Sequence, residues 1–171
     1  MSFRVRALHA RDAEALWHLD KALVEDGRGM VLGPSDLPPT PADKETSVHK
    51  RLADAFAYTL VALHGESRRL VGYAEWNRLR PLKLRHNVVL AMGVSPEFQG
   101  QGVGRLLLRQ LVEDARRAEP AITRIELGVV ADNTRARALY ESVGFHLEGV
   151  RRAFVQDERG KRDDCLMSLL L

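Results

Sequence analysis

The chain has 171 residues, of which 45% are apolar and 29% are charged, and its formal net charge is +3. These values are ordinary for a soluble globular protein and favour a single domain, residues 1–171. The lone cysteine, Cys165, excludes an internal disulfide, and no apolar run approaches the roughly 20 residues of a membrane span. The first residues, MSFRVRALHA, lack the apolar stretch of a signal peptide, so we expect a soluble, cytoplasmic protein.

The first half of the chain alternates strand and helix patterns. Residues 3–7 alternate apolar and charged side chains, as in a half-buried strand, and residues 12–25 repeat apolar side chains at helical spacing. Residues 27–41 hold three glycines and four prolines, which predicts a long loop of the kind that forms lids. Further along, the pattern predicts a helix over 42–56 and a hairpin of strands over 57–64 and 70–79.

The second half predicts a strand–helix–strand unit followed by more strands. Residues 87–94 are almost continuously apolar, as in a strand buried on both faces, and residues 103–118 carry one apolar helical stripe. After these come a strand over 122–130, a helix that Asn133 opens and Gly144 closes, and a hairpin of 145–155 with 163–170. The chain is therefore predicted to be an α/β (α+β) domain with a central mixed, mostly antiparallel sheet.

A glycine-rich segment stands between the strand over 87–94 and the helix that begins near residue 103. Glycine lets the backbone turn with positive φ and come close to a ligand. A helix start leaves N–H groups unpaired and carries partial positive charge, which suits a phosphate. The segment therefore predicts a phosphate or pyrophosphate site formed by Gln99, Gly100, Gln101, Gly102, Val103, Gly104 and Arg105.

Two common nucleotide motifs do not fit this segment. The dinucleotide fingerprint G-x-G-x-x-G needs a glycine where Arg105 stands, and the chain has too few strand–helix–strand units for a doubly wound sheet. A Walker A loop needs Gly-Lys-Ser/Thr, which is absent from the sequence. The phosphate therefore belongs to another kind of ligand.

The segment VSPEFQGQGVGRLLLRQLVEDA resembles the acetyl-CoA motif of the GNAT acetyltransferases, whose consensus is Q/R-x-x-G-x-G/A. The three fixed places of that consensus are filled by Gln99, Gly102 and Gly104. Downstream, IELGVVADNTRARALYESVGFHLEGV resembles the second motif of the family, through Asn133, Ala138, Leu139, Tyr140, Gly144 and Phe145. The resemblance implies the GNAT fold, with about six or seven strands and about four helices around one core.

The resemblance also implies acetyl-CoA as co-substrate and gives roles to individual residues. Residues 99–105 would cradle its pyrophosphate, and the backbone of Met92, Gly93 and Val94 would pair with its pantetheine arm like an added strand. Asn133 would bind near the pantetheine, and Tyr140 would protonate the departing thiolate. From the residues alone, Asn133 fits equally well as the N-cap of its helix, and Tyr140 as a core residue on an apolar face.

The residue that takes the proton from the attacking amine is harder to find. Histone-type members of the family carry a glutamate about where Val88 stands, and the ribosomal-protein alanine acetyltransferases carry one where this chain has Gly128. Both substrate assignments are weakened by these differences. Candidate bases are His86, two residues before Val88 and so expected on the same strand face, and Glu75 on the preceding strand. Each also fits a plain surface position, and a water relay is the third option.

Three functional classes remain open at this stage. The favoured one is an N-acetyltransferase that acetylates a primary amine, of a small molecule or amino acid rather than of a protein N-terminus or lysine. The second is a non-catalytic acyl-CoA-binding sensor of the same fold. The third, a nucleic-acid-binding module, is disfavoured because no helix carries a basic stripe interleaved with aromatic residues. We expect acetyl-CoA and an amine acceptor as partners, no metal, nucleic acid or membrane, and leave a homodimer open.

Overall fold

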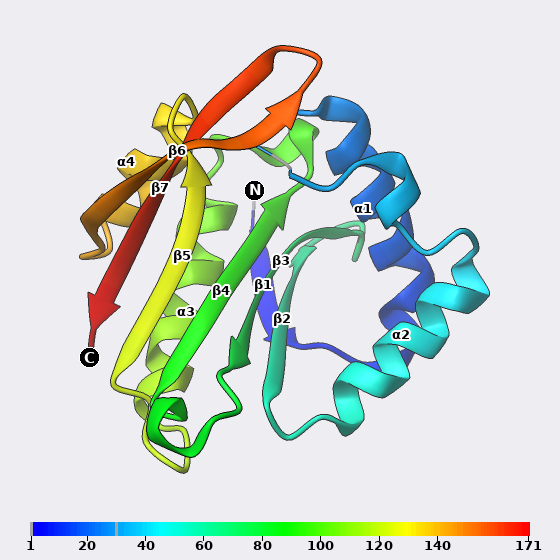
Figure 1. The fold of residues 1–171 in the computed structure, drawn as a ribbon. Helices are drawn as coiled ribbons and strands as arrows, with labels where there is room; N and C mark the ends of the chain where they lie inside the picture. The colour runs from blue at the N-terminus through cyan, green and yellow to red at the C-terminus, as the bar shows by residue number, and fades with distance from the viewer. Residues whose placement is uncertain (1, 30) are drawn as a thin grey trace.

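The structure is a computed structural model that describes residues 2–29 and 31–171. Its seven strands form one sheet in the order β1-β2-β3-β4-β5-β7-β6 (Figure 1). Every neighbouring pair is antiparallel except β4 with β5, so the predicted mixed, mostly antiparallel sheet is confirmed. The strands are β1 (Phe3–Ala7), β2 (Ala57–His64), β3 (Leu70–Arg78), β4 (Asn87–Val94), β5 (Arg124–Val130), β6 (His146–Asp157) and β7 (Gly160–Leu170).

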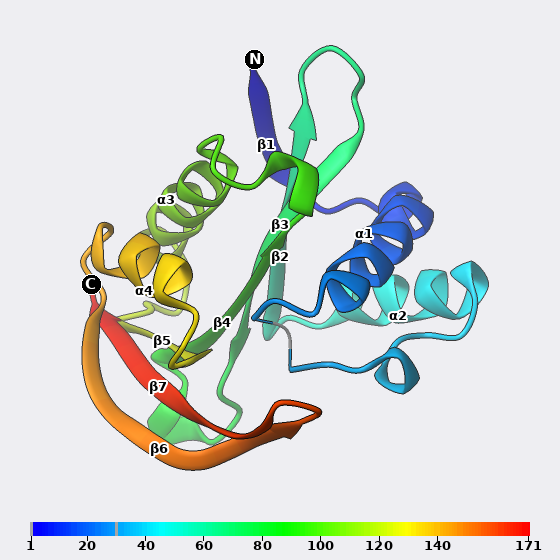
Figure 2. The same ribbon diagram turned by 90° about the horizontal axis from the view of Figure 1, so that it is seen from above.

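Four α-helices cover the two faces of this sheet in pairs. Figure 2 shows α1 and α2 on one side of the sheet and α3 and α4 on the other. The helices are α1 (Ala13–Asp26), α2 (Pro41–Ala53), α3 (Val103–Arg116) and α4 (Thr134–Glu141). In the described part of the chain, no helix combines the length and apolar character that crossing a membrane requires.

Each face of the sheet has its own apolar core. The larger core lies under α3 and α4 and contains the fully buried Leu107, Ile125 and Phe145. The smaller core lies under α1 and α2 and is built around Leu16, Leu19, Leu23, Val48 and Val61. Successive strand residues point to opposite faces, so β2 contributes Leu60 and Ala62 to the larger core and Val61 to the smaller one.

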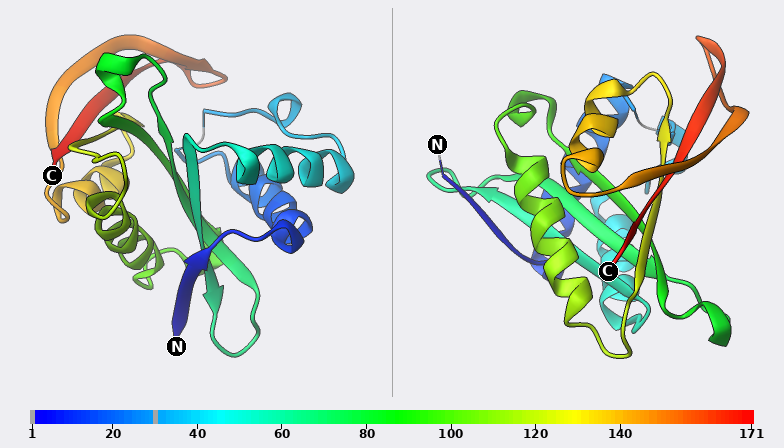
Figure 3. Two further views of the ribbon diagram at one scale, coloured as in Figure 1. Left: turned by 90° about the horizontal axis from the view of Figure 1, so that it is seen from below. Right: turned by 90° about the vertical axis from the view of Figure 1, so that its left-hand side faces the viewer.

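Strands β4 and β5 are paired at one end only. Their register joins Asn87 to Arg124, Val88 to Ile125 and Val89 to Glu126, and no further residues of the two strands pair. Beyond that point the strands separate toward the top of Figure 1, while the β6–β7 hairpin curves away over the same end (Figures 1 and 3). The two central strands are therefore unpaired beyond Val89 and Glu126, and we call this unpaired interval between β4 and β5 the slot.

The sequence placed most element boundaries within two or three residues. The strands over 3–7, 57–64 and 87–94 agree with β1, β2 and β4. The long loop ends one residue earlier than expected, because Thr40 caps α2 and Pro41 occupies its first turn. Its middle also forms a short 3-10 turn, Pro34–Asp36, and its Met30 lies outside the described residues.

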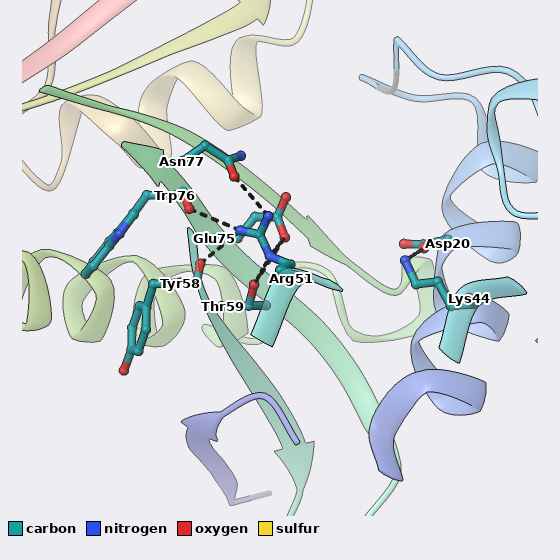
Figure 4. A network of polar contacts seen from close by, with 8 residues as sticks. All are labelled: Asp20, Lys44, Arg51, Tyr58, Thr59, Glu75, Trp76 and Asn77. Atoms are coloured by element: carbon teal, nitrogen blue, oxygen red, sulfur yellow. Dashed lines mark hydrogen bonds and ion pairs between the residues drawn. The ribbon is translucent and has the colours of Figure 1, made fainter. Parts of the chain in front are cut away.

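A single arginine on α2 joins that helix to the sheet (Figure 4). Arg51 donates hydrogen bonds to the backbone carbonyls of Tyr58 and Trp76, each at 3.1 Å, and to Oδ1 of Asn77 at 3.0 Å. Its Nε donates to the hydroxyl of Thr59 and lies 3.2 Å from a carboxylate oxygen of Glu75. Because these partners belong to β2 and β3, Arg51 fixes the position of α2 over both strands.

We expect Arg51→Ala to destabilise the protein by about 2–4 kcal/mol, because it leaves two carbonyls and a carboxylate without their partner. For a chain of this size that corresponds to a drop in melting temperature of roughly 5–15 °C. Lys50→Ala on the same helix is the matched control, since Lys50 is exposed and makes no recorded polar contact within residues 2–29 and 31–171. Equal melting temperatures for the two variants would contradict the role given to Arg51.

Candidate active site

The glycine-rich segment forms a turn whose backbone N–H groups are unpaired. Gly100 and Gly102 adopt positive φ values of 78° and 87°, and Gly102 is the N-cap of α3. Within the described chain, the N–H groups of residues 100–105 have no hydrogen-bond acceptor, whereas that of Leu106 bonds to Gly102 at 3.0 Å. A row of free N–H groups at a helix start is the arrangement that binds phosphate oxygens.

Side chains on either side of the turn hold it in this shape. Nε2 of Gln99 donates to the carbonyl of Val94 at 3.1 Å, and Nε2 of Gln101 donates to the carbonyl of Glu97 at 2.8 Å. Val103 is buried in the larger core. Gln99 therefore anchors the turn to the end of β4, Gln101 anchors it to the 3-10 turn Pro96–Phe98, and the N–H groups remain available for a ligand.

Two arginines add positive charge beside these N–H groups. Arg105 is exposed in the first turn of α3. Arg135, from α4, reaches over the turn, with Nη1 at 3.4 Å from Oε1 of Gln99. A Cβ on Gly100 would lie 2.8 Å from Nη2 of Arg135, so glycine is what allows this approach. The sequence had indicated Arg105 as a positive charge at this site, whereas Arg135 is brought to it only by the fold.

The slot presents the free edge of β4 close to this turn. Met92, Gly93 and Val94 pair with β3 on one side, while their other edge faces the slot where β5 has moved away. Unpaired backbone groups in a sheet need a hydrogen-bonding partner. Gly93 has no room for a side chain, because a Cβ there would collide with Leu23 of α1 and lie 3.1 Å from Cε1 of Tyr73.

Asn133 begins α4 at the mouth of the slot. Its Oδ1 accepts a hydrogen bond from the backbone N–H of Ala136 at 3.2 Å, so the N-cap interpretation is confirmed. Its Nδ2 packs against Gly29, at a place where no Cβ would fit. The loop after α1 thus touches the start of α4, and the mouth of the slot is bounded by both.

Tyr140 lies on the α3/α4 side of the sheet with its ring buried. The residue is 8% exposed, and its ring centroid is 5.8 Å from that of Phe145. Burial raises the pKa of Tyr140 to about 12. Its hydroxyl has no hydrogen-bond partner in the described chain, and the residue belongs to the larger apolar core. A buried ring with a protonated hydroxyl fits both a core residue and a proton donor.

Glu75 lies on the opposite face of the sheet, on the α1/α2 side (Figure 4). One oxygen, Oε2, accepts from the hydroxyl of Thr59 at 3.3 Å and pairs with Arg51 at 3.2 Å. Burial raises the pKa of the Glu75 carboxyl, although Arg51 and Lys44 oppose that shift. A carboxylate with a raised pKa is a stronger base than an ordinary glutamate.

His86 does not share this environment. It precedes β4 rather than lying on it, it is exposed, and its carbonyl accepts from the backbone N–H groups of Thr123 and Arg124. The expected strand position is therefore wrong, because β4 begins at Asn87. From there the strand runs roughly 25 Å to the glycine turn at about 3.3 Å per residue, so His86 lies at the far end from the slot.

The fold also gathers polar residues that sequence patterns did not indicate. Asp20 of α1 is buried and pairs with Lys44 of α2 at 2.6 Å, and burial raises the pKa of its carboxyl (Figure 4). Burial likewise raises the pKa of Tyr73, which lies on the same face as Glu75. For Asp20 the sequence signal is a charged residue on the apolar face of a helix, and it can be interpreted only when the partner helix is known. In residues 2–29 and 31–171, no His, Cys, Asp and Glu side chains cluster in a way that could hold a metal ion.

Comparison with known proteins gives the family. A model described as the acetyltransferase (GNAT) family matches residues 30–145. The N-alpha-acetyltransferase RimI of Mycobacterium tuberculosis is 44% identical over 85 residues, which are 50% of this chain and 51% of that protein. This chain thus spans about half the length of the curated relatives it matches.

Solved structures share the whole fold. The ribosomal-protein-alanine N-acetyltransferase from Brucella melitensis has a TM-score of 0.84 at 27% identity, covering 98% of this chain and 99% of that one. The phosphinothricin acetyltransferase from Sinorhizobium meliloti, solved with AcCoA, has a TM-score of 0.86 at 23% identity, covering 100% and 89%. With the glycine turn, the open slot and the family match in agreement, this chain belongs to the GNAT family of acetyltransferases.

Proposed function

We propose that this chain is an N-acetyltransferase that transfers the acetyl group of acetyl-CoA to a primary amine of a small molecule or amino acid, by direct attack in a ternary complex. The observation that carries this proposal is the unpaired backbone of residues 100–105 beside the open edge of β4. One continuous sheet from Phe3 to Leu170 supports a single domain over residues 1–171.

The residues present fit such a co-substrate. The N–H groups of residues 100–105, with Arg105 and Arg135, would hold the pyrophosphate, and the free edge of β4 at Met92, Gly93 and Val94 would pair with the pantetheine arm. Acetyl-CoA would supply a thioester, whose carbonyl carbon is the electrophile. An N–H on the same β4 edge would polarise the thioester carbonyl, because charge gathers on its oxygen during attack.

Two side chains on opposite faces would handle the protons. On the α1/α2 face, Glu75 takes the proton from the attacking amine, directly or through water, because its Oε1 is not used by Thr59 or Arg51. On the α3/α4 face, Tyr140 gives a proton to the departing thiolate, since its raised pKa keeps it protonated at neutral pH. The glutamate is our choice over His86, which lies away from the slot.

A second acceptor class has support from the comparisons. The RimI similarity favours the α-amine of a protein N-terminus, because that relative is an N-alpha-acetyltransferase. The loop of residues 27–41 would form part of either acceptor pocket, since Gly29 touches Asn133 at the slot. Screening amino acids, polyamines and N-terminal peptides for acetyl-CoA-dependent thiol release separates these classes. A chain that binds acetyl-CoA but acetylates none of them would be the sensor.

Gly102→Asp should abolish acetyl-CoA binding while the fold survives. The position has open space for a Cβ, and Asp is among the residues that tolerate a positive φ, but its carboxylate would repel the phosphates. Gly102→Asn is the matched control, with the same size and no charge. Calorimetry should show a dissociation constant raised about 100-fold or more for Asp and much less for Asn, because like charges at a phosphate site cost several kcal/mol. Wild-type affinity in the Asp variant would place the phosphates elsewhere.

Tyr140→Phe should lower kcat roughly 100-fold and leave acetyl-CoA affinity nearly unchanged, because only the proton donor is removed. The loss should shrink as pH falls, since solvent becomes a better proton source. Single-turnover rates between pH 6 and 9 measure this. A variant that keeps wild-type kcat over that range would show that Tyr140 is only a core residue.

Glu75→Gln should lower kcat/KM by roughly 10²–10³-fold at neutral pH, because the amide cannot accept the amine proton. The carboxyl pKa of Glu75 is raised, so its basic form appears as pH rises through that value. Wild-type kcat/KM should therefore rise with pH over the range in which the Glu75 carboxyl loses its proton. The variant should not show this rise. If both enzymes give superimposable pH profiles, the base is another group.

A further inference from the structure

One arginine of the β6–β7 hairpin is held rigidly while part of its guanidinium stays free. Nε and Nη2 of Arg151 donate to Oδ2 of Asp164 at 2.9 and 2.5 Å, and Asp164 is only 3% exposed. The guanidinium carbon lies 3.7 Å from the ring centroid of Phe154. Nη1 has no partner in the described chain, and the side chain is 42% exposed. Such an arginine is fixed in orientation and presents unused donors.

An irregularity in the β6–β7 backbone lies next to the Arg151–Asp164 pair. The β6–β7 register shifts between Arg151 and Val155, and within that bulge Ala153 has a positive φ of 53°. The N–H of Ala153 donates to Oδ1 of Asp163 at 2.8 Å, which holds the bulge in place. A non-glycine residue in this conformation costs free energy, and such strain concentrates at functional positions.

A glycine on the neighbouring strand leaves room for the pair. A Cβ on Gly128 would lie 2.7 Å from Nη2 of Arg151 and 3.1 Å from both carboxylate oxygens of Asp164. The guanidinium therefore lies directly over β5, at a level where this strand has left β4. Any side chain at position 128 would compete with the Arg151–Asp164 pair for that space.

This position faces the proposed acceptor side of the slot. Glu75 pairs with Ala91 on β4, and Ala91 is level with Gly128, because Val89 pairs with Glu126 two residues earlier on each strand. Residues 75, 91 and 128 therefore lie in one row on the same face of the sheet. At roughly 5 Å per strand, Glu75 and the guanidinium are separated by at least about 10 Å, with the slot between them.

We propose that Arg151 binds the carboxylate of the acceptor, so that the preferred substrates are free α-amino acids or similar amines that carry a carboxylate. This inference rests on the proposed acetyl transfer. Asp164 already neutralises the guanidinium, so a singly charged carboxylate fits the free Nη1 side better than a phosphate dianion, which the Asp164 carboxylate would repel. Arg151 would hold the carboxylate at one side of the slot, and the amine would point toward Glu75.

The test compares acceptors that differ only in the carboxylate. Purified enzyme is assayed with acetyl-CoA and common L-amino acids, each beside its carboxamide and an N-terminal peptide that starts with it. The amino group of the carboxamide is less basic than that of the free acid, so more of it is neutral and reactive at neutral pH. A preference for the free acid would therefore show that the enzyme recognises the carboxylate. We expect kcat/KM to favour the free acids by roughly 10–100-fold, the range of one charge-assisted hydrogen-bond pair.

The variants separate recognition from folding. Arg151→Gln leaves Asp164 buried without a partner, so the double variant Arg151→Gln with Asp164→Asn, which removes both charges, is the main one. It should raise KM for the acids about 10–100-fold, leave kcat/KM for the amides within about 3-fold, and spare acetyl-CoA affinity. Arg151→Lys should restore part of the preference. Arg152→Gln, an exposed neighbour without recorded polar contacts in the described chain, is the control and should behave as wild type.

Two outcomes would overturn the inference in different ways. If acids, amides and peptides react equally well, or if the double variant keeps the acid preference, Arg151 does not bind the acceptor carboxylate. The proposed acetyl transfer would be unaffected by either result. If acetyl-CoA binds and no amine of any form is acetylated, the proposed function fails and the inference fails with it.

Discussion

The separation of β4 from β5 is the constraint on which the rest of the site depends. Parallel neighbours inside a sheet normally pair along their length, and leaving N–H and carbonyl groups unpaired costs free energy unless a ligand or water satisfies them. Here pairing stops after Val89 and Glu126, although both strands continue toward the glycine turn. The larger core continues under both strands, with Val88 and Leu90 on one and Ile125 and Leu127 on the other, so the slot is closed on the side of α3. A long, thin ligand with its own hydrogen-bonding groups is the natural occupant of such a gap.

Glycines let other parts of the chain reach this gap. Gly93 admits Leu23 of α1 against the end of β4, and Gly104 lets α3 pack against Leu139 of α4, whose Cδ2 would lie 3.0 Å from a Cβ there. Gly128 admits the Arg151–Asp164 pair in the same way. None of these three glycines has a positive φ, so what each of them provides is space for a neighbouring side chain. A glycine in a motif can thus be required by packing as much as by the ligand.

The sequence was sufficient for features that are local. Alternation predicted β1 to the residue, and the strands over 57–64 and 87–94, the latter from its almost continuous apolar run, match β2 and β4. The glycine turn at a helix start was predicted because its chemistry lies in seven adjacent residues, 99–105. Features built from distant segments could not be predicted. Arg51 lies 24 residues before Glu75, and nothing local says that α2 crosses β3 there. The strand position expected for His86 was wrong because β4 begins one residue later, at Asn87.

The acid–base roles that we propose for Glu75 and Tyr140 would also depend on the exclusion of water from the slot. A phenol whose pKa is about 12 is a poor donor to an ordinary thiolate, whose conjugate acid has a pKa of about 8.5. Burial is the cause of the high value for Tyr140, and burial of the departing thiolate in the slot would raise the pKa of that thiol as well, because desolvation disfavours every anion. The two pKa values therefore approach each other only while the thiolate lies in the slot. In the proposed reaction, proton transfer from Tyr140 would then be favoured, and the phenol would stay protonated between turnovers.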